Sequence, residues 1–185
     1  MNYLRGFIAW IAFAIVAPAG CQWGALAALL VGLVLLGRDR ATGTPADSLI
    51  LECSSVAYFA ALAAWTFAFP HSSLSSWTGA LSWAWLAVTA WATLALGRPF
   101  TEGIAKRQTP PQVWQHPLFR RANVVITAAW ATAFTLSAVA MTVIYAAGLG
   151  TGASVAVQIA GFGLPVLFTN RYRGRMLERA ARLSR

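Results

Sequence analysis

The chain has 185 residues, of which 58% are hydrophobic and only 10% are charged, whereas soluble domains carry about 25% charged residues. This composition excludes an ordinary soluble domain, and the length leaves room for one transmembrane domain, residues 1–185. A net charge of +9 would suggest nucleic-acid binding in a soluble protein. In this chain we attribute the charge to membrane topology, and we expect no nucleic-acid partner.

The first apolar stretch, residues 7–36, is long for one untilted helix and short for two. Pro18–Gly20 lies at its middle, where proline interrupts the backbone hydrogen bonds and glycine permits a reversal. We therefore predict a short helical hairpin, Tyr3–Ala17 and Cys21–Gly37, that is retained and not cleaved as a signal peptide. A single tilted helix, with the N-terminus on the other side of the membrane, is the alternative.

Four further apolar runs follow, and about 20 helical residues are needed to cross the hydrocarbon core. They are Leu49–Phe69, Thr78–Leu96, Asn123–Ala147 and the shorter Ala153–Asn170. Only a helix satisfies all backbone polar groups within one isolated segment in lipid. The sequence therefore predicts an all-α, polytopic transmembrane helix bundle of about six membrane segments.

The basic residues occupy alternate gaps between these runs. Segments Gly37–Asp47, Gly97–Arg121 and Arg171–Arg185 hold thirteen of the fourteen Lys and Arg residues, whereas Pro70–Trp77 and Gly148–Ser154 hold no charge. Short loops rich in Lys and Arg stay in the cytoplasm. We expect both termini to be cytoplasmic, with residues 97–121 as an interfacial loop and residues 171–185 as a basic tail. The tail would attract anionic lipid headgroups.

The connection between the runs Thr78–Leu96 and Asn123–Ala147 has the clearest local pattern. Pro99 can start a short interfacial helix, because proline is favoured at the first helical position. Phe100 and Ile104 would then share one face. Glu102 and Lys106 would form an i,i+4 ion pair on another.

Small residues and tryptophans predict where helices meet. The pairs Gly20/Gly24 and Ala60/Ala64, each spaced by four, would allow close helix approach. Tryptophans near the ends of the runs would anchor the membrane interfaces. The deeper ones are expected to pack in the interior: Trp65, Trp83, Trp85, Trp91 and Trp130.

Few polar side chains fall at membrane depth: Glu52, Asn123, Thr127 and Gln158. An ionisable group there is a functional candidate, because it is costly unless paired or hydrated. Glu52 lies near the cytoplasmic edge, where it can pair with a basic residue or handle a proton or substrate. The candidate partners are Arg38, Arg98 and Arg121. Gln158 is expected to hydrogen-bond a neighbouring helix, and lining a pore is its alternative.

Nothing in the sequence has the spacing of a catalytic or metal site. His71 and His116 fall on opposite sides of the membrane in this topology, so they cannot share a metal ion. Gly148–Gly152 follows no strand and is not a phosphate loop. Cys21 and Cys53 lie in apolar runs and are expected to pack as small hydrophobic residues. We predict that the protein is not an enzyme and has no cofactor.

One region carries a family resemblance. Gly97–Phe100 is followed by an amphipathic stretch with Gln112–Trp114 and by a span with Ala129–Trp130 and Phe134. This pattern, with the order of spans, resembles the intracellular septation protein A family of bacterial inner-membrane proteins. The resemblance implies a multi-pass inner-membrane protein of cell division and the cell envelope that contacts other inner-membrane proteins without catalysis. By matching position it singles out Gly97, Arg98, Pro99, Trp114 and Trp130.

Two functional hypotheses follow. The first is the septation-type interaction protein. The second is a small transporter or lipid-handling protein in the bilayer, working as a homo-oligomer because one copy has few helices to enclose a path. A hydrated polar cavity that reaches Glu52 or Gln158 would favour transport, whereas a dry, Trp-packed bundle would favour interaction.

Overall fold

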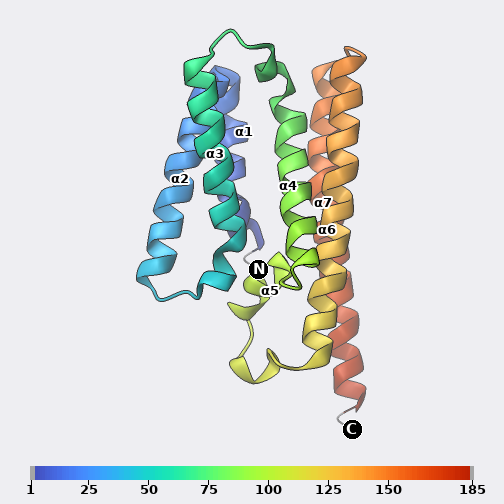
Figure 1. Cartoon of the computed structure of the whole chain (residues 1–185). Coiled ribbons are helices and arrows are strands. Elements are labelled where there is room, and N and C mark those ends of the chain that lie inside the picture. Colours follow the sequence, from blue (N-terminus) through green and yellow to red (C-terminus); the bar gives the residue numbers. More distant parts are fainter. Residues whose placement is uncertain (1–2, 184–185) are drawn as a thin grey trace.

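The computed structural model describes residues 3–183, which form an elongated all-α bundle with no strand in that range (Figure 1). The α-helices are α1 (Ile8–Val16), α2 (Cys21–Ala41), α3 (Ile50–Ala68), α4 (Thr78–Ala95), α5 (Phe100–Lys106), α6 (Pro117–Ala146) and α7 (Thr151–Leu183). Short 3-10 helices connect them: η1 (Tyr3–Phe7), η2 (Ala17–Ala19), η3 (Ala46–Leu49), η4 (Ser73–Trp77) and η5 (Pro111–Val113). The predicted all-α architecture is confirmed.

Four helices are long and apolar enough to cross a membrane: α2, α3, α6 and the Thr151–Met176 part of α7. A fifth candidate is the pair formed by α4 and α5, which is bent by 81° at the break between its two helices. The helix at Arg5–Ala19 is apolar but shorter than these. Several long apolar helices indicate a membrane protein.

Three helices extend beyond their predicted bounds. α2 continues to Ala41, α6 begins at Pro117, and α7 continues through the basic tail to Leu183. The apolar run and the helix need not end together, because Arg, Leu and Ala favour helix in water as well as in lipid. The extension of α2 puts Asp39 on a helix, where the sequence predicts a loop.

The first apolar stretch is a hairpin, as predicted. The chain reverses at η2, where Gly20 has a φ of +140° that only glycine adopts readily. Gly24 then faces the backbone of Ala17: a Cβ added at Gly24 would lie 2.8 Å from the Ala17 Cα. The close approach predicted for Gly20/Gly24 is present at Gly24, whereas Gly20 serves the turn. The one predicted for Ala60/Ala64 is wrong, because both alanines lie on the exposed side of α3.

The segments that carry basic residues and the uncharged loops lie at opposite ends of the bundle. The α2–α3 loop, the segment from α4 to α6 and both termini lie at one end, and the η2 turn, the α3–α4 loop and the α6–α7 loop lie at the other (Figure 1). The basic residues belong to the first set of segments, whereas loops 69–77 and 147–150 carry no charge. We call the first end the basic end and the second the opposite end.

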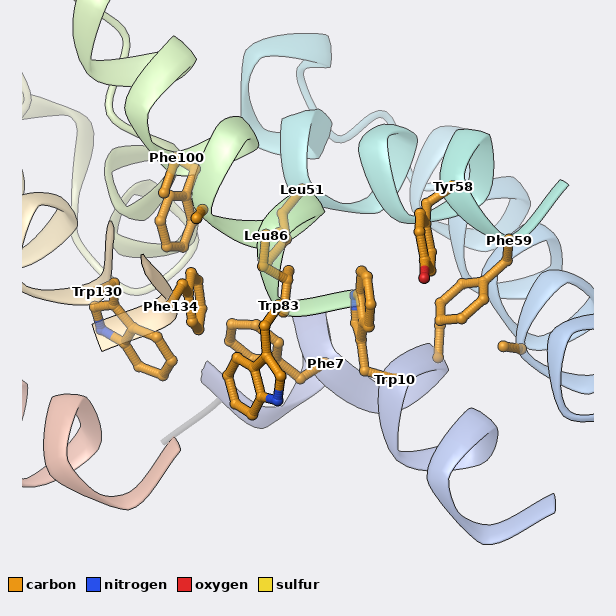
Figure 2. Close-up of a cluster of buried hydrophobic side chains, with 14 of the residues drawn as sticks. Phe7, Trp10, Leu51, Tyr58, Phe59, Trp83, Leu86, Phe100, Trp130 and Phe134 are labelled. Carbon is orange, nitrogen blue, oxygen red and sulfur yellow. The ribbon is translucent and has the colours of Figure 1, made fainter. Parts of the chain in front are cut away.

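Two groups of helices form the bundle, α1 to α3 and α4, α6 and α7, and the N-terminal segment joins them. Phe7 stacks on Trp130 of α6 at 5.2 Å between ring centroids, and meets Phe162 of α7 at 5.2 Å. One turn later, Trp10 packs on Tyr58 and Phe59 of α3 at 5.1 and 4.7 Å (Figure 2). These side chains, together with Trp83 and Phe134, form a continuous core that we call the aromatic core.

The tryptophans follow the prediction only in part. Trp83 and Trp130 are buried, but Trp65, Trp85 and Trp91 are exposed on the outer surface. Two of the exposed rings still satisfy their polar group, since Trp85 Nε1 donates to Ser54 Oγ (2.9 Å) and Trp91 Nε1 to Thr135 Oγ1 (3.1 Å). A ring facing lipid with a satisfied N–H contributes apolar surface without an unpaired donor.

We predict that Gly24→Ala destabilises the α1–α2 hairpin, because its Cβ meets backbone atoms that no side-chain rotation can move. The expected loss is about 1–3 kcal/mol of unfolding free energy, measured by denaturant titration in detergent micelles. Gly37→Ala is the matched control on the same helix, since nothing lies within 4 Å of its added Cβ. Equal stability of the two variants would contradict the close packing of the hairpin.

Candidate functional site

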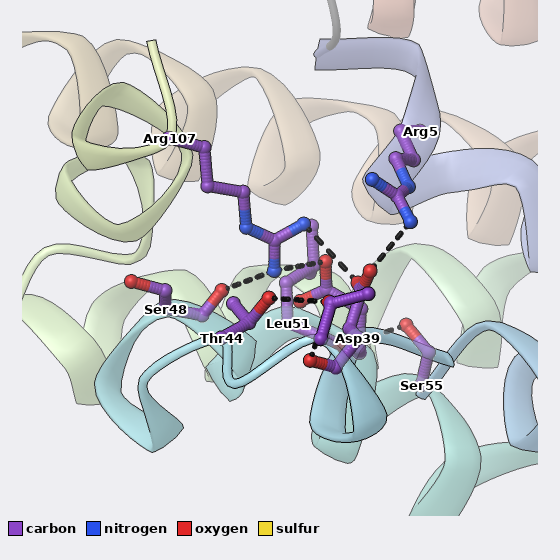
Figure 3. Close-up of polar contacts among 9 residues, drawn as sticks. Arg5, Asp39, Thr44, Ser48, Leu51, Ser55 and Arg107 are labelled. Carbon is purple, nitrogen blue, oxygen red and sulfur yellow. Dashed lines mark hydrogen bonds and ion pairs between the residues drawn. The ribbon is translucent and has the colours of Figure 1, made fainter. Parts of the chain in front are cut away.

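Four charged side chains from four segments meet at the basic end (Figure 3). They are Arg5 of η1, Asp39 of α2, Glu52 of α3 and Arg107, which follows α5. Both carboxylates are removed from solvent, with exposed fractions of 3% for Asp39 and 8% for Glu52. We call this group the ionic cluster, and its two positive and two negative charges cancel.

The guanidinium of Arg107 links the members of the cluster. Its Nη1 lies 3.4 Å from Asp39 Oδ2, and its Nη2 lies 2.9 Å from Glu52 Oε1. The same Nη2 donates to the backbone carbonyl of Ser48 at 2.6 Å. Arg5 Nη2 donates to the other oxygen of Asp39. Arg107 therefore joins α2, η3 and α3 through the planar fork that suits arginine to carboxylates.

Hydrogen bonds from uncharged groups hold the backbone around the cluster. The carbonyl of Asp39 accepts from Thr42 Oγ1 and from the Thr44 N–H, both at 3.0 Å. On α3, Ser55 Oγ accepts from Trp10 Nε1 at 2.8 Å, one turn beyond Glu52. The first two bonds fix the loop that follows α2, and the third ties the start of α3 to α1.

Glu52 has a basic partner, as the sequence predicts, but that partner is none of the three expected candidates. Its partner is Arg107, whereas Arg38, Arg98 and Arg121 are exposed. The sequence leaves Asp39 in a loop, whereas in the structure α2 continues through Asp39 and places it beside Arg107. A signal was present, because Ala25, Gly32 and Asp39 recur every seven residues and so share one face of α2. All three are buried.

The short helix α5 occurs where it was predicted, but it packs against the other helices at the basic end of the bundle. Phe100 and Ile104 share a buried face, and Lys106 Nζ lies 3.1 Å from Glu102 Oε1, as expected. Thr101 Oγ1 lies 2.7 Å from Thr127 Oγ1 and donates to the backbone carbonyl of Asn123 at 3.0 Å. α5 is therefore attached to α6 and is more than an interfacial helix.

Most residues singled out by the family resemblance are buried or end a helix, so they contribute to the fold. Gly97 closes α4 with a φ of +67°, and Pro99 is fully buried beside it. Trp130 is 1% exposed, and its Nε1 donates to Thr169 Oγ1 at 3.0 Å, which ties α6 to α7. Asn123, one of the polar candidates at membrane depth, is also buried, and its Nδ2 donates to the Phe119 carbonyl of its own helix at 2.9 Å.

Arg98 and Trp114 are the two members of that set that reach the surface. Arg98 is exposed, and its side chain has no hydrogen bond or ion pair within residues 3–183. Trp114 is half-buried, donates to the Thr109 carbonyl at 3.1 Å, and lies with its ring centroid 5.8 Å from Lys106 Nζ. The loop after α5 is thereby folded back onto α5.

Two hollows open at the basic end. The first, about 460 Å³, lies between the loop after α5 and helices α6 and α7, and we call it the apolar pocket. Its lining includes Pro110, Val113, Leu118, Phe119, Ile126 and Met176, with His116 and Arg173 among its polar members. The second, about 440 Å³, lies where α4 turns into α5, and we call it the basic pocket. It is lined by Ile50, Gly97, Pro99 and Gly103 and by the charged Arg98, Glu102, Lys106 and Arg120.

A third hollow, the outer cleft, lies between the two groups of helices and is lined by segments from the opposite end. It has a volume of about 370 Å³ and contains Gln158. Gln158 was predicted to hydrogen-bond a neighbouring helix, but its side chain is exposed there without a partner among the described residues. Trp10 and Trp83 of the aromatic core also line the cleft.

The described residues show no metal centre. No group of three or more His, Cys, Asp and Glu side chains within them could hold a metal ion. His71 lies in the α3–α4 loop at the opposite end and His116 directly before α6 at the basic end, and Cys21 and Cys53 form no disulfide. The charged groups of the ionic cluster pair with one another and do not form a metal site.

Comparisons with protein-family models, with curated proteins and with solved structures found no match for this chain.

We predict that Arg107→Met destabilises the protein by about 3–5 kcal/mol, because it leaves two buried carboxylates with only Arg5 to compensate them. Arg121→Met, an exposed arginine outside the cluster, should change the unfolding free energy by no more than about 0.5 kcal/mol. Chemical denaturation of the purified protein in detergent measures both.

The triple variant Asp39→Asn, Glu52→Gln, Arg107→Met removes the uncompensated charge and should recover a large part of that loss. If the triple variant is as unstable as Arg107→Met alone, uncompensated charge is not the cause of the loss.

Proposed function

We propose that this chain is a multi-pass protein of the bacterial inner membrane, of cell-envelope or septation type, that docks a partner protein at its basic end. In this proposal the basic end faces the cytoplasm, as the retention of short Lys- and Arg-rich loops predicts. The envelope or septation role rests on the resemblance of the Gly97–Phe134 region. The docking role rests on one observation, the apolar pocket at the charged end of the bundle.

A partner protein can insert an apolar side chain into the apolar pocket. Val113 and Leu118 are both more than a third exposed at its edge, beside exposed polar residues of the same loop. The loop does not depend on a partner for its shape, since Trp114 fixes it to Thr109 and Arg107 fixes its start to α2 and α3. A preformed pocket lowers the ordering cost of binding.

Charge indicates the chemistry of the partner. Arg173 and His116 line the pocket, and Arg121 is exposed on α6 next to Ala122, which also lines it. A partner segment with an apolar anchor between acidic residues would fill the hollow and match the charges of Arg173 and Arg121.

The interior of the bundle favours a function in binding a partner protein over a function in transport. The aromatic core occupies the junction between the two groups of helices, and Trp10 and Trp83 line both that core and the outer cleft. Glu52, the group proposed for proton handling, is held by Arg107 and lines neither the outer cleft nor the pockets at the basic end. A carboxylate paired in this way is not available to a substrate, because breaking a buried ion pair costs about 3–5 kcal/mol.

The docking proposal is tested by site-specific photo-crosslinking in cells with the probe at Val113 or Leu118. The expected result is a discrete protein adduct at both sites, identified by mass spectrometry, with acidic residues in the crosslinked segment. A probe at Leu136, which is 64% exposed on α6 but is not part of the apolar pocket, is the control and should give no such adduct.

A second variant separates docking from chance proximity. With the probe moved to Gln115, on the same loop, Leu118→Trp should fill the pocket and reduce the adduct severalfold, while membrane insertion is unchanged. Adducts with lipid only, or an adduct that Leu118→Trp leaves at full yield, would reject the docking function.

One observation favours a second candidate, a small homo-oligomeric transporter or lipid-handling protein. The outer cleft presents the unpartnered Gln158 amide beside aromatic rings, a lining that suits an uncharged amphiphile. On this hypothesis Gln158→Leu lowers uptake of such a solute into proteoliposomes several-fold. Glu52→Gln, outside the cleft, leaves uptake per folded protein unchanged. Equal uptake by Gln158→Leu and the unmodified protein would remove the transport candidate.

A further inference from the structure

We infer that the basic pocket binds the phosphate-bearing headgroup of an anionic lipid. This inference uses only the membrane setting of the bundle and is independent of partner docking in the apolar pocket. The two hollows have no lining residue in common.

The charge of the pocket is unbalanced. Its lining carries the three cations Arg98, Lys106 and Arg120 and the single carboxylate Glu102. Glu102 already pairs with Lys106 at 3.1 Å. Arg98 has no partner within residues 3–183, and Arg120 makes only a long contact of 3.5 Å from Nη2 to the Gly97 carbonyl. Two guanidinium groups are therefore available to one anion.

The pocket also keeps these groups close together. Gly97 turns the chain with a φ of +67°, and the buried Pro99 starts α5, so Arg98 projects from a fixed turn. Arg120 reaches the same turn from the first part of α6, since its Nη2 lies near the Gly97 carbonyl. Arginine at two fixed positions suits the oxygen atoms of a phosphate, which accept several N–H donors at once.

The surroundings indicate a lipid more than a free anion. The pocket lies where the apolar helix α4 ends, at the 81° bend into α5. Leu96, directly before the turn, is 76% exposed, and Ile50 forms part of the lining. An amphiphile with its phosphate on Arg98 and Arg120 would place its first acyl carbons beside these apolar side chains. Basic pockets between helices at the cytoplasmic side are typical headgroup sites.

The test is lipid binding by native mass spectrometry of the full chain from nanodiscs of equal parts phosphatidylglycerol and phosphatidylcholine. The unmodified protein should retain phosphatidylglycerol in preference to phosphatidylcholine. The double variant Arg98→Gln, Arg120→Gln should bind phosphatidylglycerol roughly tenfold more weakly. The matched control has the same net charge: Arg38→Gln, Arg121→Gln, two exposed arginines outside the pocket, should keep the preference.

A variant that is expected to bind phosphatidylglycerol more tightly distinguishes loss of the site from a folding defect. Glu102→Gln removes the only carboxylate of the pocket, so its affinity for phosphatidylglycerol should rise severalfold. Equal weakening by the control pair would show a diffuse basic surface and overturn the site. Unchanged or weaker binding by Glu102→Gln would also overturn it.

A second experiment distinguishes a lipid headgroup from free phosphate as the ligand of the basic pocket. Millimolar inorganic phosphate added to protein in phosphatidylcholine nanodiscs should raise the midpoint of thermal unfolding much less than phosphatidylglycerol does. An equal rise, abolished by Arg98→Gln, Arg120→Gln, would assign the pocket to a free anion and reject the lipid. These outcomes do not depend on crosslinking at Val113 and Leu118, so the lipid site and the docking function can fail separately.

Discussion

The protein depends on keeping two carboxylates buried beside apolar helices. Such a group costs several kcal/mol unless a charge and hydrogen bonds compensate it. Arg107 supplies most of that compensation, since it reaches Asp39, Glu52 and the Ser48 carbonyl from a single side chain. Because Arg107 follows α5 directly, the same contact that neutralises the carboxylates also holds α5 under the bundle. Both pockets at the basic end have walls made by α5 or its flanking segments, which this interaction helps to hold in place.

A second constraint is that α3 and α4, which belong to different groups of helices, touch each other at only a few residues. Helices in lipid gain nothing from hydrophobic exclusion and must pack closely to associate. α2 does so with glycine and alanine, as at Gly24 and Gly32, whereas the two groups of helices meet through large rings. Phe7 and Trp10, only three residues apart, reach α6 and α3 respectively. The N-terminal segment therefore joins both groups, and Arg5 beside it anchors that segment to Asp39.

Much of the fold was predictable because its signals are local. The length of an apolar run, the Pro18–Gly20 break and the Glu102/Lys106 spacing each depend on neighbouring residues, and the structure agrees with them. The contacts that define the site are not local. Arg107 lies 55 residues from Glu52 and 68 from Asp39, and no sequence pattern chooses it over Arg38, Arg98 or Arg121. In the same way, five tryptophans in apolar runs look alike in sequence, yet two are buried and three face outward.

The arrangement of polar groups along the bundle bears on what the protein can do. A transport path needs polar groups that stay hydrated and can exchange partners through the interior. Here the buried carboxylates lie at one end and are paired with arginines. The unpartnered amide of Gln158 lines the outer cleft between the helix groups, which the segments of the opposite end help to form. The aromatic core fills the junction between the helix groups with stacked and edge-on rings, which favour fixed geometry. A bundle organised in this way holds its surfaces in place, and surfaces held in place are what docking a partner and binding a headgroup both require.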